Sequence, residues 1–150
     1  MSNEKIYPSS GKIYQKLHNY PVRVFYEDTD AGGIVYYANY LKFAERARSE
    51  LLRTLGFNNS RLFNSNGEQV AFAVKTCEID YKQPARLDDA LNVFTKVVEI
   101  KGASLTMEQN IFKDENLLVV FKVKLACIKL NDGKPSRLLD DVKSALEKLI

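Results

Sequence analysis

Residues 39–57 read NYLKFAERARSELLRTLGF, and this stretch decides the fold. Apolar side chains recur in it every three or four residues, and the stripe they form consists of Tyr40, Ala44, Ala47, Leu51 and Leu55. The pattern predicts an amphipathic helix of about 17 residues that stops at Gly56. The small Ala44 and Ala47 let another segment approach the helix backbone, and Arg48 needs a partner because it falls on the buried side.

Four strand patterns follow this helix, with no second long helix between them. The first begins near Val70 and ends before Pro84, and residues 90–135 contain three more. Turn residues separate these strands, and Gly102 suits a turn position with positive φ. One face of such a sheet must be covered, and only one long helix is present to cover it. We therefore predict an α+β fold, in which an antiparallel sheet wraps around one long central helix.

The two ends of the chain add smaller elements. Residues 1–19 are rich in Ser, Lys and Tyr, which indicates an irregular N-terminal arm. Residues 20–27, YPVRVFYE, alternate as a strand does. Residues 136–150 predict a short C-terminal helix with an apolar side made of Leu138, Leu139, Val142, Leu146 and Ile150. We expect a single domain over residues 1–150, and a homodimer because an open sheet leaves an edge that a second copy would cover.

Composition narrows the class of protein. With 45% hydrophobic residues, 27% charged residues and a net charge of +3, the chain is typical of a globular domain and has no nucleic-acid signature. Cys77 and Cys127 lie in apolar strand patterns and are expected to be buried thiols. One histidine and no CxxC pair leave few zinc ligands, so we expect no metal. The start lacks a secretory signal and the longest apolar run falls far short of the roughly 18 residues a membrane span needs, so we expect a cytoplasmic protein.

The segment before the long helix, FYEDTDAGGIVYYANY at residues 25–40, carries more chemistry than a connection needs. A calcium loop would use Asp28, Asp30 and Gly33, but Gly32 stands where an oxygen ligand belongs and Asn39 where a bidentate glutamate belongs. A phosphate cradle is also disfavoured, because neither the GxGxxG nor the GxxxxGK[ST] spacing is present.

A third interpretation is a catalytic carboxylate that faces a helix N-terminus. In an extended strand Asp28 and Asp30 point to the same side. Gly32 and Gly33 allow the backbone to approach a ligand closely. The first amides of the helix have no intrahelical partner, so they suit an oxyanion that develops on a carbonyl oxygen. The alternative, in which both aspartates only cap and brace a turn, stays open on these residues alone.

The sequence from Val22 to Phe57, VRVFYEDTDAGGIVYYANYLKFAERARSELLRTLGF, resembles the hotdog-fold acyl-CoA thioesterases. The similar branch contains 4-hydroxybenzoyl-CoA thioesterase and the bacterial thioesterase encoded alongside the Tol–Pal envelope system. The resemblance continues through VAFAVKTCEIDYKQPARLDDAL and EIKGASLTMEQNI, and it covers roughly residues 21–135. It implies a hotdog thioesterase domain that hydrolyses acyl-CoA as a homodimer or tetramer, without a cofactor, and with acyl carrier protein as a further possible partner.

The resemblance also implies roles for particular residues. Asp30 would be the catalytic carboxylate, acting as nucleophile or as general base, and the backbone amide of Tyr37 would polarise the thioester carbonyl. The envelope-associated members carry histidine where this chain has Tyr37, and a phenol is a poor general base at neutral pH. Ser104 would contact Asp30 or the substrate. Residues in regions similar to the coenzyme A phosphate contacts of the family are Lys101, Lys134 and Arg137.

Two alternative activities stay open at this point. A hotdog dehydratase would need a histidine beside its carboxylate, and the single histidine, His18, is expected on the surface of the N-terminal arm. A module that binds acyl-CoA or acyl carrier protein without hydrolysis would keep the same loop for its shape alone. Glu45 on the helix is the substitute carboxylate if Asp30 is structural, although it falls on the polar stripe.

Overall fold

The computed structural model describes residues 3–150. Its centre is a six-stranded antiparallel sheet with the strand order β1-β2-β4-β5-β6-β3. In chain order the elements are β1 (Lys12–Tyr14), β2 (Leu17–Arg23), the short 3-10 helix η1 (Tyr26–Asp28), α1 (Asn39–Thr54), the 3-10 helix η2 (Asn59–Arg61), β3 (Val70–Tyr81), β4 (Ala90–Lys101), β5 (Ser104–Lys113), β6 (Asn116–Lys129) and α2 (Asp140–Glu147). The predicted α+β class is confirmed.

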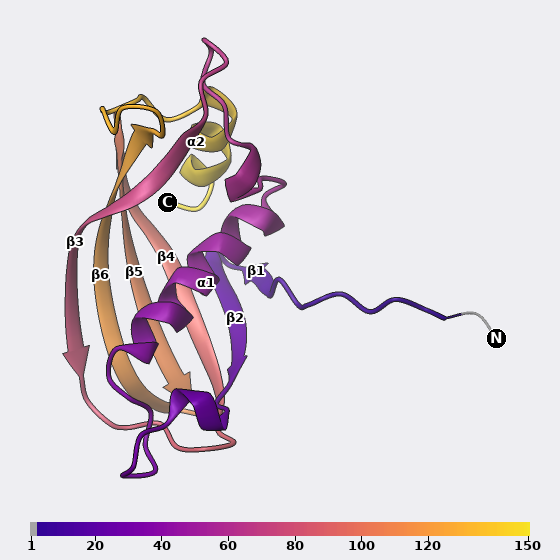
Figure 1. The fold of residues 1–150 in the computed structure, drawn as a ribbon, viewed down its shortest axis with the longest axis vertical. Helices are drawn as coiled ribbons and strands as arrows, with labels where there is room; N and C mark the ends of the chain where they lie inside the picture. The colour runs from indigo at the N-terminus through magenta and orange to yellow at the C-terminus, as the bar shows by residue number, and fades with distance from the viewer. Residues whose placement is uncertain (1–2) are drawn as a thin grey trace.

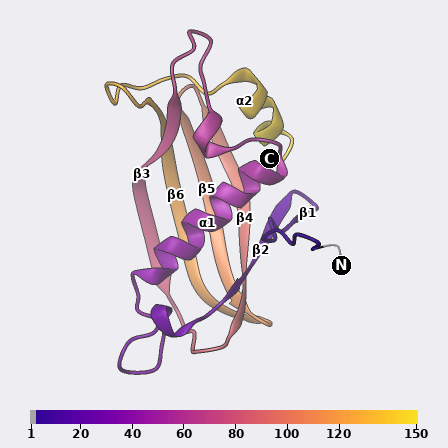
Figure 2. The ribbon, with the colours of Figure 1, turned by 45° about the vertical axis from the view of Figure 1, so that its right-hand side comes forward.

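The long helix α1 lies across one face of this sheet (Figures 1 and 2). Side chains alternate between the two faces of a strand, so every second residue of the central strands points at the helix. These inward residues are buried, and they include Leu91, Val93, Val97, Leu105, Met107, Ile111, Val119, Phe121, Val123 and Leu125. Each large apolar side chain among them contributes about 1.5–3 kcal/mol by leaving water. The predicted wrapping of a sheet around one central helix is therefore confirmed.

A buried amide ties α1 to the sheet. Gln109 of β5 is fully buried, and its Oε1 accepts a hydrogen bond from Arg48 Nη1 at 3.0 Å. This is the partner that Arg48 was expected to need. Gln109 Nε2 donates to the Ala44 carbonyl and to Thr95 Oγ1, each at 3.0 Å. Because Ala44 has only a methyl side chain, the Gln109 side chain can reach the helix backbone. The helix then ends before Gly56, whose φ is +96°.

The prediction of an irregular arm over residues 1–19 is wrong for its second part. β1 and β2 form a hairpin there, joined by Gln15 and Lys16 with φ values of 49° and 67°. Two successive positive φ values are what a two-residue type I′ turn requires, and Gln-Lys is an unusual pair for it. Residues 3–11 contain no helix or strand; Ser10 and Gly11 lie against β2, and the chain before them extends away from the body of the molecule (Figure 1).

The strand predicted at residues 20–27 is displaced towards the N-terminus. β2 already ends at Arg23, and the chain then turns through η1. Asp28 is consequently part of a 3-10 helix, so the expectation that it points with Asp30 to one side of an extended strand is wrong.

His18, predicted as a surface histidine, is fully buried on β2. Its Nε2 donates to the Ser10 carbonyl at 2.7 Å, and Thr54 Oγ1 donates to the same carbonyl at 3.2 Å. Burial lowers the pKa of His18 below its usual 6.5, and the bond to Ser10 and the Glu50 carboxylate offset part of that effect. His18 therefore anchors the start of the chain against the end of α1.

The strand order explains which cysteine is buried. Cys127 lies in β6, between two strands, and is buried as predicted. Cys77 lies in β3, the last strand of the sheet, and is exposed, so its predicted burial is wrong. The exposed part of this edge strand includes Val74, whose side chain is 52% exposed.

The C-terminal helix α2 packs near one end of the core (Figure 1). Val142 and Leu146 are buried as the apolar pattern predicted, but Ile150 is exposed because α2 ends at Glu147. None of the helices within residues 3–150 is long and apolar enough to cross a membrane.

Candidate active site

The loop between η1 and α1 is a tight turn. Thr29 pairs with Val35, the Asp30 amide donates to the Ile34 carbonyl at 3.0 Å, and the Gly33 amide donates to the Asp30 carbonyl at 3.0 Å. Gly33 has a φ of +76°, a conformation that favours glycine. These bonds put Asp30 near the exposed tip of the turn.

Asp28 braces this loop from inside. Its side chain is buried, and Oδ2 accepts a hydrogen bond from the Phe25 amide at 2.9 Å. Its carbonyl accepts two more, from the Tyr36 amide at 2.9 Å and from Asn39 Nδ2 at 2.8 Å. The interpretation in which an aspartate only caps and braces a turn therefore holds for Asp28. Within residues 3–150, no group of three or more His, Cys, Asp or Glu side chains is placed to hold a metal ion.

Asp30 has a different environment, because its carboxylate is exposed. Oδ1 accepts a hydrogen bond from the Gly32 amide at 2.8 Å, and none of the hydrogen bonds among residues 3–150 involves Oδ2. A Cβ atom at position 32 would lie only 3.2 Å from Oδ1, so glycine leaves the carboxylate room to sit over this amide. The amide orients one oxygen and leaves the other available for chemistry.

The start of α1 offers unpaired amides. The Tyr36 amide is used by Asp28 and the Asn39 amide donates to the Tyr36 carbonyl at 2.8 Å, but among residues 3–150 no acceptor pairs with the amides of Tyr37 and Ala38. Such amides carry partial positive charge and can stabilise an anion. The Tyr37 side chain is 62% exposed.

The other predicted site residues lie at the opposite end of the molecule. The turn between β4 and β5 carries Lys101 and Ser104, which line a hollow of about 260 Å³ together with Pro135. Lys101 Nζ pairs with Glu99 at 3.2 Å. Figures 1 and 2 both show this turn and the segment after β6 at one end of the long axis, and the loop before α1 at the other. One chain does not bring them to Asp30.

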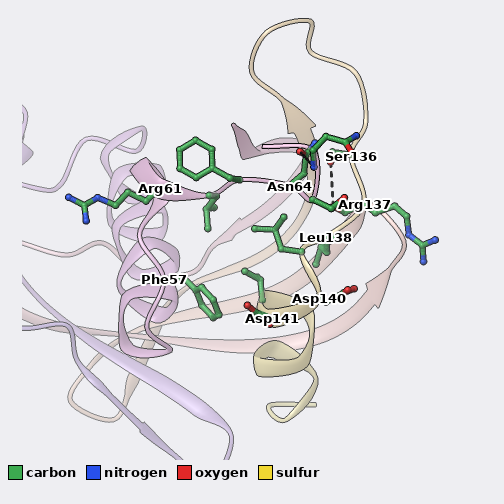
Figure 3. A pocket seen from close by; sticks show the side chains of 14 residues that line it. Phe57, Arg61, Asn64, Ser136, Arg137, Leu138, Asp140 and Asp141 are labelled. Carbon is green, nitrogen blue, oxygen red and sulfur yellow. Dashed lines mark hydrogen bonds between the residues drawn. The ribbon is translucent and has the colours of Figure 1, made fainter. Parts of the chain in front are cut away.

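Arg137 lies at that same far end, beside a larger cavity. The cavity measures about 890 Å³ and is formed by the segment after α1 and the start of α2, with an apolar side that includes Phe57, Leu62 and Leu138. Figure 3 shows the side chains of Arg61 and Arg137 extending away from it on opposite sides. Lys134 is adjacent, in the turn where its carbonyl accepts a bond from the Lys129 amide at 2.9 Å.

Comparison with known proteins identifies the family. The family model of the thioesterase-like superfamily matches residues 24–146. This chain belongs to the thioesterase-like superfamily. The acyl-CoA thioesterase YbgC of Haemophilus influenzae is 49% identical over 131 residues, which cover 87% of this chain and 95% of that protein. The acyl-CoA thioester hydrolase YbgC of Escherichia coli O6:H1 is 45% identical over 123 residues, covering 81% of this chain and 90% of that protein.

A solved structure agrees with this assignment. The crystal structure of a probable thioesterase from Bartonella henselae is 44% identical and has a TM-score of 0.78, covering 81% of this chain and 98% of that chain. The resemblance to hotdog thioesterases, drawn first from the loop and helix motif, is confirmed for the family and the fold.

Two residues that contact this loop from neighbouring elements, Asn39 at the start of α1 and Tyr81 at the end of β3, escaped the sequence interpretation. Asn39 bridges the start of α1 to Asp28, and an Asn directly before an apolar periodic segment is a typical signal for a helix start. Tyr81 Oη donates to the Tyr37 carbonyl at 3.0 Å. The only signal for Tyr81 was its place at the end of an alternating strand, which does not tell which loop it meets.

Proposed function

We propose that this chain is an acyl-CoA thioesterase that hydrolyses the thioester to a free acid and coenzyme A. Membership of the thioesterase-like superfamily supports this, as do relatives at 45–49% identity that are named acyl-CoA thioesterases or thioester hydrolases. The observation that carries the chemistry is an exposed carboxylate, Asp30, on the loop that leads into a helix whose Tyr37 amide is unpaired.

In this proposal the thioester carbonyl oxygen accepts a hydrogen bond from the Tyr37 amide. As the carbonyl carbon is attacked, negative charge grows on that oxygen, and a single donor of this kind stabilises the transition state by about 3 kcal/mol. Asp30 either removes a proton from the attacking water, or attacks the carbon itself to give a mixed anhydride that water then hydrolyses to the free acid, restoring the carboxylate. The carbon–sulfur bond then breaks and coenzyme A leaves as the thiolate. The backbone amide supplies its hydrogen bond whatever side chain position 37 carries.

We propose further that each active site combines two chains. β3 is an edge strand with one side unpaired, which favours pairing with a second copy. A two-fold axis through the middle of β3 would set the Tyr81 end of one chain beside the Val70 end of its partner. Tyr81 holds the Tyr37 segment, so Asp30 of one chain would approach the far end of the other.

That far end carries the residues proposed to bind coenzyme A, namely Ser104, Lys101, Lys134 and Arg137. Cationic side chains suit the phosphates of coenzyme A, and Gly32 and Gly33 leave room for the pantetheine arm at the loop. Assembly of two pairs into a tetramer, an interaction with acyl carrier protein and a cytoplasmic location stay predictions.

The rival activities make different predictions. A dehydratase would need a histidine at the site, and His18 is buried on β2 and bonded to Ser10. A binding module would retain the thioester without releasing a thiol. Release of free coenzyme A from a panel of aliphatic and aromatic acyl-CoA substrates, followed with a thiol reagent, separates hydrolysis from both.

The role of Asp30 is tested by Asp30→Asn. We expect kcat to fall at least about 100-fold with unchanged thermal unfolding, because the amide group is nearly the same size but neither attacks nor accepts a proton. Glu27→Gln, which removes an exposed charge in the same segment, is the matched control and should keep its turnover. Turnover of Asp30→Asn close to that of the unmodified protein would falsify the catalytic role.

Sharing of the site between chains is tested by mixing two impaired variants, Asp30→Asn and Arg137→Glu. If each site takes Asp30 from one chain and Arg137 from the other, a mixed pair contains one intact site. Random reassembly of equal amounts should then restore about a quarter of full activity, since half of the pairs are mixed and half of their sites are intact. A site built within one chain would give no recovery.

A further inference from the structure

Tyr81, the last residue of β3, reaches the loop that leads into α1. Its hydroxyl donates to the Tyr37 carbonyl at 3.0 Å. Its ring meets the Tyr37 ring edge-on at a centroid distance of 6.2 Å and the Tyr40 ring at 5.8 Å. We propose that Tyr81 is a positioning residue, which fixes the Tyr37 backbone so that its amide is aimed at the substrate carbonyl. This inference rests on the proposed thioesterase function.

The Tyr37 carbonyl needs an outside donor. The regular helical donor would be the amide of Leu41, but that amide bonds to the Ala38 carbonyl at 3.2 Å instead. Among residues 3–150, the Tyr81 hydroxyl is the donor recorded for the Tyr37 carbonyl. Without it, the peptide group between Tyr37 and Ala38 would be free to rotate at the first turn of the helix.

Tyr37 is thereby held from both sides. Before it, the Tyr36 amide donates to the Asp28 carbonyl at 2.9 Å, and after it, its own carbonyl accepts from Tyr81. The first anchor comes from the loop and the second from the edge of the sheet. The peptide group that carries the Tyr37 N–H also contains the Tyr36 carbonyl, which accepts a bond from the Asn39 amide at 2.8 Å. The two anchors fix the peptide groups on either side of it, so the three bonds together set the direction of the Tyr37 N–H. A donor on the Tyr37 carbonyl also polarises the shared peptide group and strengthens the Ala38 N–H.

Packing of the ring does not explain why position 81 carries a hydroxyl group. The Tyr81 side chain is 44% exposed, so its burial contributes little, and a phenylalanine would make the same ring contacts. Burial raises the pKa of the Tyr81 hydroxyl, so the group stays protonated and remains a donor at neutral pH.

The kinetic test is Tyr81→Phe, with Tyr14→Phe as the matched control because Tyr14 is exposed on β1. Loss of one neutral hydrogen bond that acts on the transition state should lower kcat about tenfold. KM should change less than about twofold, because the hydrogen bond from this amide strengthens mainly as negative charge grows on the carbonyl oxygen in the transition state. The control should be unchanged in both. An unchanged kcat in Tyr81→Phe, or a loss expressed in KM alone, would overturn the inference.

A second measurement does not depend on hydrolysis. Tyr37–Ala38 is the only Tyr-Ala pair in the sequence, so labelling tyrosine carbonyls with 13C and alanine amides with 15N gives a single carbonyl-to-amide NMR correlation. Tyr81→Phe should move this signal while Tyr14→Phe leaves it in place. A signal that stays still in Tyr81→Phe would overturn the positioning role, even if turnover fell. If the unmodified protein hydrolyses no acyl-CoA, the proposed function fails and this signal still decides whether Tyr81 fixes the Tyr37 carbonyl.

Discussion

Replacing Gln109 with methionine should measure how much the hydrogen bonds of Gln109 between β5 and α1 contribute to the free energy of unfolding. Methionine fills a similar volume but makes none of the three hydrogen bonds that Gln109 makes to Arg48, Ala44 and Thr95. Two of these are neutral and are worth about 1 kcal/mol each, and the bond from the guanidinium is worth about 2 kcal/mol. Removing one partner also leaves the half-buried Arg48 cation without its acceptor.

The loss of these bonds is partly offset because methionine buries more apolar surface, which stabilises the fold by about 1 kcal/mol. We therefore expect Gln109→Met to lower the free energy of unfolding by about 3 kcal/mol. For a domain of this length such a loss corresponds to a fall in melting temperature of about 9 °C. The measurement is urea unfolding at one fixed protein concentration, because the proposed pairing of two chains would make apparent stability depend on concentration.

Gln83→Met is the matched control, since Gln83 is exposed and its side chain makes no hydrogen bond within residues 3–150. It should change the free energy of unfolding by less than about 0.5 kcal/mol. The double variant Arg48→Met with Gln109→Met should lose about 1–2 kcal/mol less unfolding free energy than the two single variants lose together. In the double variant neither side chain is left without its partner. A Gln109→Met protein as stable as the unmodified one would refute the claim that these hydrogen bonds stabilise the packing of α1 on the sheet.

Three further predictions follow from single positions. Gly11→Ala should cost about 3 kcal/mol of unfolding free energy, because a Cβ there would lie 2.1 Å from the Asn19 carbonyl oxygen at a φ of +75°. Gly67→Ala has the same φ and an open surrounding, so it should cost only about 1 kcal/mol by the same urea measurement. Because burial lowers the pKa of His18 in the folded state, the unfolded chain takes up this proton first as the pH falls, and stability should decline below pH 6.5. Urea unfolding between pH 7.5 and 5.5 should show this decline, and His18→Gln should flatten it by up to about 1.4 kcal/mol per pH unit. Tyr37→Phe should keep kcat within about threefold of the unmodified protein, since the proposed role belongs to the backbone amide, and a 100-fold loss would indicate a role for the hydroxyl.

Local pattern predicted the helix and the strands well, and it failed where structure depends on distant segments. The stripe of α1 is an internal property of its own sequence, so it could be recognised directly. Whether Cys77 is buried depends instead on the place of β3 in the sheet, and the sequence of a single strand does not reveal the strand order. The hairpin at Gln15 and Lys16 was missed for a different reason, since neither residue type is favoured at the positive φ that both adopt.

In the candidate site, too, features set by adjacent residues could be predicted and features set by distant residues could not. The residues alone indicated two aspartates beside a helix start, and the resemblance to hotdog thioesterases singled out Asp30 and Tyr37 as the proposed site residues. That Asp28 and not Asp30 braces the loop could not be decided from the sequence, because this role depends on bonds to Phe25 and Asn39 that exist only once η1 forms. Tyr81 could not be predicted either, since 44 residues separate it from the carbonyl that it contacts.

The distance between the two groups of proposed site residues favours the proposal that two chains form each active site. A thioester joined to coenzyme A is long, and in one chain the loop before α1 and the turn between β4 and β5 lie at opposite ends of the long axis (Figure 1). Antiparallel pairing of two β3 edges would place these ends together twice, once on each side of the two-fold axis, so that a pair holds two equivalent sites. It would also cover the backbone groups that an exposed edge leaves open to aggregation. Tyr81 lies on that same strand, so in this proposal one element makes both the contact between the two chains and the bond to the Tyr37 carbonyl.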